Sequence, residues 1–131
     1  MNYTRPLFNT LLNTLAKPTP VMHVLIGPRQ VGKTTVARQV EAVITIPVVY
    51  ATADSPVPLD TAWIETQWRR AATRVTAPGE PVLLILDELQ KVRGWSETLK
   101  LLWDSRAGGP DIRVLVLGSS DMLVQEGLSE R

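Results

Sequence analysis

The sequence predicts an α/β fold in which helices cover both faces of a parallel sheet. Short apolar segments alternate along the chain with segments of helical periodicity, and this alternation is typical of β-α-β units. Residues 82–86 are all apolar, as expected of a central parallel strand that is buried on both faces. The 131 residues are expected to form one domain, with boundaries at residues 1–131.

Proline and glycine clusters separate eight segments whose periodicity assigns them to helices or strands. We expect helices over residues 4–17, 33–43, 59–76 and 95–106. We expect strands over residues 21–26, 46–51, 82–86 and 113–117. A further helix is expected to begin within residues 121–125.

Composition and charge argue against several classes of protein. The net charge is +1, which gives no long-range field that would favour nucleic acid. The sequence has no cysteine, so disulfides and cysteine-based metal sites are excluded. Its apolar runs are far shorter than the roughly 20 residues that cross a bilayer, and its N-terminus lacks the apolar core of a signal peptide. We therefore expect a cytoplasmic protein that does not bind membranes, and its charge does not indicate nucleic acid as a partner.

Residues 27–34 have the sequence GPRQVGKT and match the Walker A pattern G-x-x-x-x-G-K-[ST] at each fixed position. A predicted strand precedes the motif and a predicted helix follows it. Backbone N–H groups of such a loop, together with the following helix N-terminus, bind phosphate oxygens. We therefore expect a nucleotide-binding loop formed by Gly27, Pro28, Arg29, Gln30, Val31, Gly32, Lys33, Thr34 and Thr35.

Three side chains of this loop are assigned separate roles. Lys33 is expected to contact the β- and γ-phosphates, and the Thr34 hydroxyl is expected to bind Mg²⁺. Thr35 is a candidate contact of the α-phosphate. The alternative is a glycine-containing turn beside a solvated lysine.

Two acidic residues, Asp87 and Glu88, follow the most apolar predicted strand, in the position of a Walker B motif. Carboxylates at the carboxyl end of such a strand lie in the crevice where α/β sheets bind ligands. We expect Asp87 to hold Mg²⁺, directly or through water, and Glu88 to orient or deprotonate the attacking water. The alternative is that both residues only cap the following turn.

Ser119 and Ser120 follow the last predicted strand. A hydroxyl at this strand end could hydrogen-bond the γ-phosphate or the attacking water, as a sensor-1 residue does. The alternative is an ordinary turn that caps the next helix.

The segments GPRQVGKTT, LLILDELQKVRGWSETLKLLWD and LVLGSSDMLVQEGLSE resemble AAA+-superfamily ATPases of bacteria and archaea. They are most similar to a family often described only as "ATP-binding protein", with a C-terminal domain of unknown function. The resemblance covers residues 21–130 and is most specific in residues 89–95. It implies a P-loop NTPase of the additional-strand catalytic-Glu type, a three-layer α/β/α sandwich.

The resemblance also implies roles for individual residues. Gly27, Gly32, Lys33 and Thr34 would form the nucleotide cradle, and Asp87 would be the acid associated with Mg²⁺. Glu88 would be the catalytic glutamate, and Ser119 or Ser120 would be sensor 1. Leu117 stands where the family usually has threonine, which removes one polar group from this strand end.

Length is the larger departure from the family, whose members usually continue for several hundred residues. We expect this chain to be an N-terminal core truncated after the fourth strand. In the family's strand order, 5-1-4-3-2, that truncation leaves the first strand at an edge, and an unpaired apolar edge promotes association.

The expected function is ATP binding and Mg²⁺-dependent ATP hydrolysis, coupled to conformational change in a larger protein. ATP and an unidentified protein are the expected partners, and an oligomer is an open alternative. Adenine is expected by resemblance, and the sequence has no N/T-K-x-D motif of the kind that reads guanine. Two other functions stay open, a nucleotide-dependent switch with little turnover and a small-molecule kinase.

Overall fold

The computed structural model describes residues 4–19, 21–27 and 32–119 of the chain. The four strands in this part of the chain are β1 (His23–Ile26), β2 (Val48–Thr52), β3 (Pro81–Asp87) and β4 (Asp111–Gly118). They form one parallel sheet in the order β1-β4-β3-β2. β1 is therefore an edge strand of the described sheet, as expected, and β4 lies between β1 and β3.

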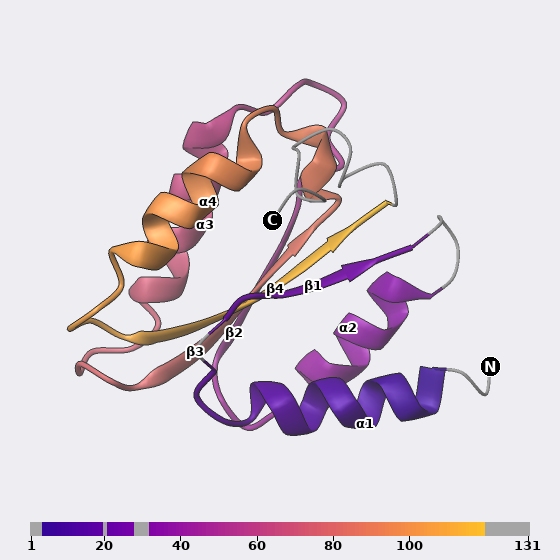
Figure 1. Cartoon of the computed structure of the whole chain (residues 1–131), viewed down its shortest axis with the longest axis vertical. Coiled ribbons are helices and arrows are strands. Elements are labelled where there is room, and N and C mark those ends of the chain that lie inside the picture. The colour runs from indigo at the N-terminus through magenta and orange to yellow at the C-terminus, as the bar shows by residue number, and fades with distance from the viewer. Residues whose placement is uncertain (1–3, 20, 28–31, 120–131) are drawn as a thin grey trace.

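Helices cover both faces of the sheet, which confirms the expected three-layer α/β/α arrangement (Figure 1). On one face lie α1 (Thr4–Leu15) and α2 (Lys33–Val43), and on the other lie α3 (Thr61–Ala72) and α4 (Trp95–Asp104). A short 3-10 helix, η1 (Leu89–Lys91), follows β3 directly. None of the helices in the described residues is both long and apolar enough to cross a membrane.

Residues of β3 and β4 alternate between two buried apolar clusters. Leu83, Ile85 and Leu115 face the helices α1 and α2. Leu84 and Val114 face the helices α3 and α4. Burying a side chain of this size contributes about 1.5–3 kcal/mol, so a strand that is apolar on both faces is strongly held in the centre of the sheet. This explains why residues 82–86 are continuously apolar.

The predicted element boundaries differ from the observed ones by two residues or more at several places. The first strand begins at His23 rather than at residue 21, because the Thr19 hydroxyl forms a local turn with the backbone of Val21. The second strand begins at Val48, after Pro47, which has no N–H to donate to a ladder. The expected helix at residues 121–125 lies outside the described residues.

The helix expected over residues 59–76 is shorter at both ends than predicted. Asp60 is its N-cap, and the Asp60 carboxylate accepts a hydrogen bond of 3.0 Å from the N–H of Ala62. The helix ends at Ala72, although the partly buried Val75 continues the apolar pattern beyond it. Periodicity alone therefore overestimated this helix, since a loop residue can pack against the same core.

The topology places several strand ends at one edge of the sheet. Because the strands are parallel, the carboxyl ends of β2, β3 and β4 point in the same direction. The N-terminus of α2 lies beside this edge, where the Thr34 side chain contacts the last residue of β3, Asp87. The fold thus brings the Walker A and Walker B segments together across 53 residues of sequence.

Candidate functional site

The described ends of the Walker A loop are tied to the sheet and to each other. The N–H of Gly27 donates to the carbonyl of Gly118 at the end of β4, at 3.3 Å. Gly32 precedes α2 with φ of 87°, a left-handed conformation that glycine adopts without steric cost. The Lys33 ammonium donates to the Gly27 carbonyl at 3.0 Å, so the lysine side chain folds back toward the start of the loop. Pro28, Arg29, Gln30 and Val31 lie outside the described residues.

Lys33, Thr34 and Thr35 form the first turn of α2 but differ in exposure. Lys33 is buried, whereas Thr34 and Thr35 are exposed. Gly32 has no side chain that could cap the first N–H groups of this helix, which leaves them available to a ligand. This arrangement is suited to an anion.

Asp87 is buried at the end of β3, with 4% of its surface exposed. Its Oδ2 atom accepts a hydrogen bond of 2.8 Å from the Thr34 hydroxyl and a second from the Tyr50 hydroxyl. Its Oδ1 atom is buried and has no hydrogen-bond partner among the described residues. A buried carboxylate oxygen without a donor is costly, and a bound cation or a water molecule would remove that cost.

The donor set around Asp87 fits Mg²⁺. A carboxylate and a hydroxyl are hard oxygen ligands, and Mg²⁺ commonly takes one or two protein ligands together with phosphate oxygens and water. Within the described residues there is no group of three or more His, Cys, Asp or Glu side chains that could hold a metal alone. Thr34 and Asp87 are therefore suited to a metal that arrives with a phosphate ligand.

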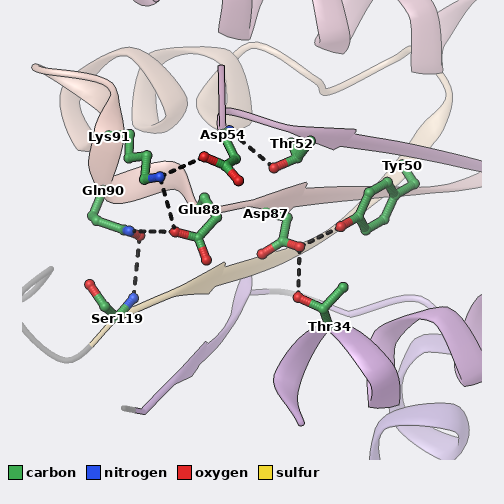
Figure 2. A network of polar contacts seen from close by, with 9 residues as sticks. All are labelled: Thr34, Tyr50, Thr52, Asp54, Asp87, Glu88, Gln90, Lys91 and Ser119. Atoms are coloured by element: carbon green, nitrogen blue, oxygen red, sulfur yellow. Dashed lines mark hydrogen bonds and ion pairs between the residues drawn. The ribbon is translucent and has the colours of Figure 1, made fainter. Parts of the chain in front are cut away.

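Tyr50 is a site residue that the sequence analysis did not identify. It lies on β2, next to β3, and its ring stacks under the Arg38 guanidinium at 3.9 Å from the ring centroid. Burial raises the pKa of Tyr50 well above its usual value, and the hydrogen bond to Asp87 and the charge of that carboxylate raise it further. Tyr50 is thus a stable donor to Asp87 (Figure 2).

Glu88 has a backbone conformation that directs its side chain away from the line of β3. Its φ is 58°, the one positive φ of a non-glycine residue in the described part of the chain. Such a left-handed conformation costs about 1–2 kcal/mol and is a feature of strained functional positions. The strand ends here, and Glu88 becomes the N-cap of η1.

The Glu88 carboxylate lies in a second polar network, separate from that of Asp87 (Figure 2). Its Oε1 atom accepts a hydrogen bond of 2.9 Å from the Gln90 amide and lies 3.9 Å from the Lys91 ammonium. The same ammonium pairs with Asp54, after β2, at 2.7 Å. The side-chain Oε1 atom of Gln90 accepts a hydrogen bond from the backbone N–H of Ser119 at 3.3 Å.

The structure brings most of the described site residues to one edge of the sheet. Gly27, Lys33, Thr34, Asp87, Glu88 and Ser119 lie there, joined by the contacts above. Thr35 lies on the same helix turn but is exposed. Ser120 lies outside the described residues.

The strand order, the Walker A sequence between β1 and α2, and the acidic pair after β3 define a P-loop α/β fold of the AAA+ type. A family model described as "AAA domain" matches residues 20–131. The chain therefore belongs to the AAA domain family, whose members have an ATPase-type nucleotide-binding fold.

Solved structures support the same fold. Two point mutants of Thermotoga maritima RuvB align with 100% of this chain, with a TM-score of 0.65 in each case. Sequence identity is 16% for one and 15% for the other, a level at which the likeness shows the fold alone. The chain covers 42% and 43% of those RuvB chains. No curated protein sequence matches the chain significantly.

Proposed function

We propose that this chain binds ATP with Mg²⁺ and hydrolyses it, and that hydrolysis is coupled to conformational change in a larger protein. The observation that carries the proposal is the buried Asp87 carboxylate. It accepts from Thr34 while its Oδ1 atom has no donor among the described residues, and Glu88 lies next to it. A capping role would not require a buried and half-satisfied carboxylate at this position.

Different residues of the site would bind the phosphates and the Mg²⁺ ion. The first N–H groups of α2 and the Lys33 ammonium would bind the phosphates, with Lys33 exchanging the Gly27 carbonyl for phosphate oxygens. Thr34 and Asp87 would hold Mg²⁺, which, when bound, offsets negative charge on the β- and γ-phosphates.

Glu88 would act on the attacking water. As the water oxygen forms a bond to the γ-phosphorus, the bond from that phosphorus to the β,γ-bridging oxygen breaks, and ADP leaves with the electron pair. The water proton passes to the Glu88 carboxylate, which acts as a general base. Glu88 leaves the strand with a left-handed backbone and becomes the N-cap of η1, which separates its carboxylate from that of Asp87.

The test is phosphate release from ATP in the presence of Mg²⁺, compared between wild type and Glu88→Gln. The substitution keeps size and hydrogen bonding but removes the base, so we expect turnover to fall by about 10²–10⁴-fold. Binding of a fluorescent ATP analogue should be retained. Glu97→Gln is the matched control, because Glu97 is an exposed carboxylate on α4.

Equal turnover by wild type and Glu88→Gln would contradict the role of Glu88. Binding without phosphate release by wild type would indicate a nucleotide-dependent switch instead. The contacts of Glu88 with Gln90 and Lys91 are compatible with that second function, since they already engage the carboxylate.

A further inference from the structure

We propose that Gln90 is a positioning residue that fixes the Glu88 carboxylate relative to the end of β4. The proposal rests on the proposed hydrolysis, in which Glu88 acts on water. Gln90 lies in η1, two residues after Glu88, and its side chain joins that carboxylate to the backbone of Ser119. It therefore links two strand ends that are adjacent in the sheet.

The two contacts of Gln90 require one orientation of its amide. The Nε2 atom donates to Glu88 at 2.9 Å, and the Oε1 atom accepts from the Ser119 N–H at 3.3 Å. The reversed amide would place an NH₂ group against the Ser119 N–H and a carbonyl oxygen against the carboxylate. Both contacts would then be repulsive, so the surroundings determine the amide orientation.

Burial makes this amide contact of Glu88 stiffer than its contact with the Lys91 ammonium. Gln90 is 8% exposed, and its neighbours Leu89 and Val92 are completely buried, so the turn that carries it is anchored in the core. Lys91, in contrast, is exposed and its ammonium is 3.9 Å from the carboxylate. Hydrogen bonds are electrostatically stronger in a desolvated setting, so Gln90 is better placed than Lys91 to set the Glu88 rotamer.

The link continues to the nucleotide loop. Gly118 accepts a hydrogen bond from Gly27, the first residue of the Walker A motif, and the next residue, Ser119, donates to Gln90. A hydrogen-bonded series thus runs from Gly27 through the end of β4 and Gln90 to Glu88. Through this series, Gln90 connects the Glu88 carboxylate to the backbone at the start of the nucleotide-binding loop.

Two substitutions of Gln90 test the hydrogen bonds that its Nε2 and Oε1 atoms form. Gln90→Glu keeps an acceptor for Ser119 but places a second carboxylate against Glu88, whereas Gln90→Met keeps the length and removes both hydrogen bonds. Gln67→Met is the matched control, because Gln67 is a similarly buried glutamine on α3 that contacts Arg70. Thermal unfolding of each variant establishes that it is folded.

In ATP hydrolysis with Mg²⁺, we expect Gln90→Glu and Gln90→Met each to lower kcat about tenfold, which is less than the roughly 10²–10⁴-fold that general base catalysis contributes. The Kd of a fluorescent ATP analogue should stay within about threefold of wild type, which is below 1 kcal/mol. In a Glu88→Gln background, Gln90→Met should lower kcat no further, because the group that it positions is gone.

Wild-type kcat in both folded Gln90 variants would overturn the proposal. An equal loss from Gln90→Met with and without Glu88→Gln would also overturn it, since a general structural effect behaves in that way. Either of these two outcomes would leave the proposed function intact, provided that Glu88→Gln by itself strongly lowers turnover. Absence of turnover in wild type would refute the proposed hydrolysis, and full turnover in Glu88→Gln would refute the role of Glu88. Either result would also remove the proposed role of Gln90.

Discussion

Asp87 and Glu88 are adjacent carboxylates, but their surroundings differ in almost every respect. Asp87 is the last residue of β3, is buried, and accepts hydrogen bonds from the uncharged donors Thr34 and Tyr50. Glu88 leaves the strand with a left-handed backbone and meets an amide and an ammonium, those of Gln90 and Lys91. The two roles proposed for these residues, holding a cation and accepting a proton, need different environments, and adjacent residues would provide them.

The two carboxylates can differ because separate elements of the structure support them. The sheet fixes Asp87, because β2 and β4 pair on both sides of β3. The turn into η1 fixes Glu88, and that turn is anchored by the buried residues Leu89 and Val92. Changes that act on only one of these supports should therefore affect only one role.

Among the effects that should distinguish the two carboxylates, the largest is expected on the Mg²⁺ dependence of nucleotide binding. Asp87→Asn removes the charge that would face the metal, so we expect the Mg²⁺ concentration for half-maximal binding of an ATP analogue to rise about tenfold or more, or 1.4 kcal/mol. Glu88→Gln should leave this concentration unchanged. A Mg²⁺ titration of analogue fluorescence measures both, and equal shifts in the two variants would remove the distinction between the residues.

Tyr50→Phe tests the support of Asp87 alone. It deletes the hydroxyl that donates to Asp87 and keeps the ring that stacks with Arg38. Loss of one hydrogen bond to a carboxylate that retains Thr34 as donor should lower the free energy of unfolding by about 1–2 kcal/mol. Urea unfolding without nucleotide measures this change. An unchanged free energy would show that the Tyr50 hydroxyl does not support the carboxylate.

The contribution of Tyr50 should also depend on pH. Its folded pKa lies above the ordinary value of 10.0, because burial and Asp87 disfavour the phenolate. Above about pH 10 the unfolded chain loses this proton while the folded chain keeps it, so stability falls as pH rises. The difference in unfolding free energy between wild type and Tyr50→Phe should be fully present below about pH 10 and shrink above it. A difference that stays constant across this range would contradict the assignment.

The smallest effect is expected on the Glu88 side, for the ion pair of Lys91 with Asp54. Side-chain exposure is 33% for Lys91 and 67% for Asp54, so water screens the pair. Lys91→Ala should change the free energy of unfolding by less than about 0.5 kcal/mol. Urea unfolding in low and high salt measures it, and a loss well above that value would mean that the Lys91 network supports the fold.

Much of this arrangement could be predicted from the sequence. The Walker A motif and the acidic pair each have fixed spacing and local context, which correctly placed Thr34 and Asp87 near each other although 53 residues separate them. The position of β1 at an edge of the described sheet followed from the family resemblance and is also confirmed. Motifs of this kind are predictable because the chemistry demands particular residues at particular spacings.

Tyr50 and Gln90 could not be predicted in the same way. Whether Tyr50 reaches Asp87 depends on the register of β2 against β3, in which Thr52 lies opposite Asp87, and no local pattern gives that register. Gln90 reaches Ser119 only because Glu88 adopts a left-handed conformation and β4 lies beside β3. Both contacts arise from tertiary pairing and not from sequence spacing.

Binding of nucleotide at the Walker A loop is tested most directly by comparing wild type with Lys33→Met. A fluorescent ATP analogue is titrated into each protein in the presence of Mg²⁺. Methionine keeps much of the buried stem and removes the ammonium, and Lys100→Met, on the exposed face of α4, is the matched control. We predict saturable binding by wild type and by the control, and an affinity at least about tenfold weaker for folded Lys33→Met, because a charge-assisted contact to phosphate is lost. Equal affinity in wild type and folded Lys33→Met would show that the nucleotide does not bind at this loop.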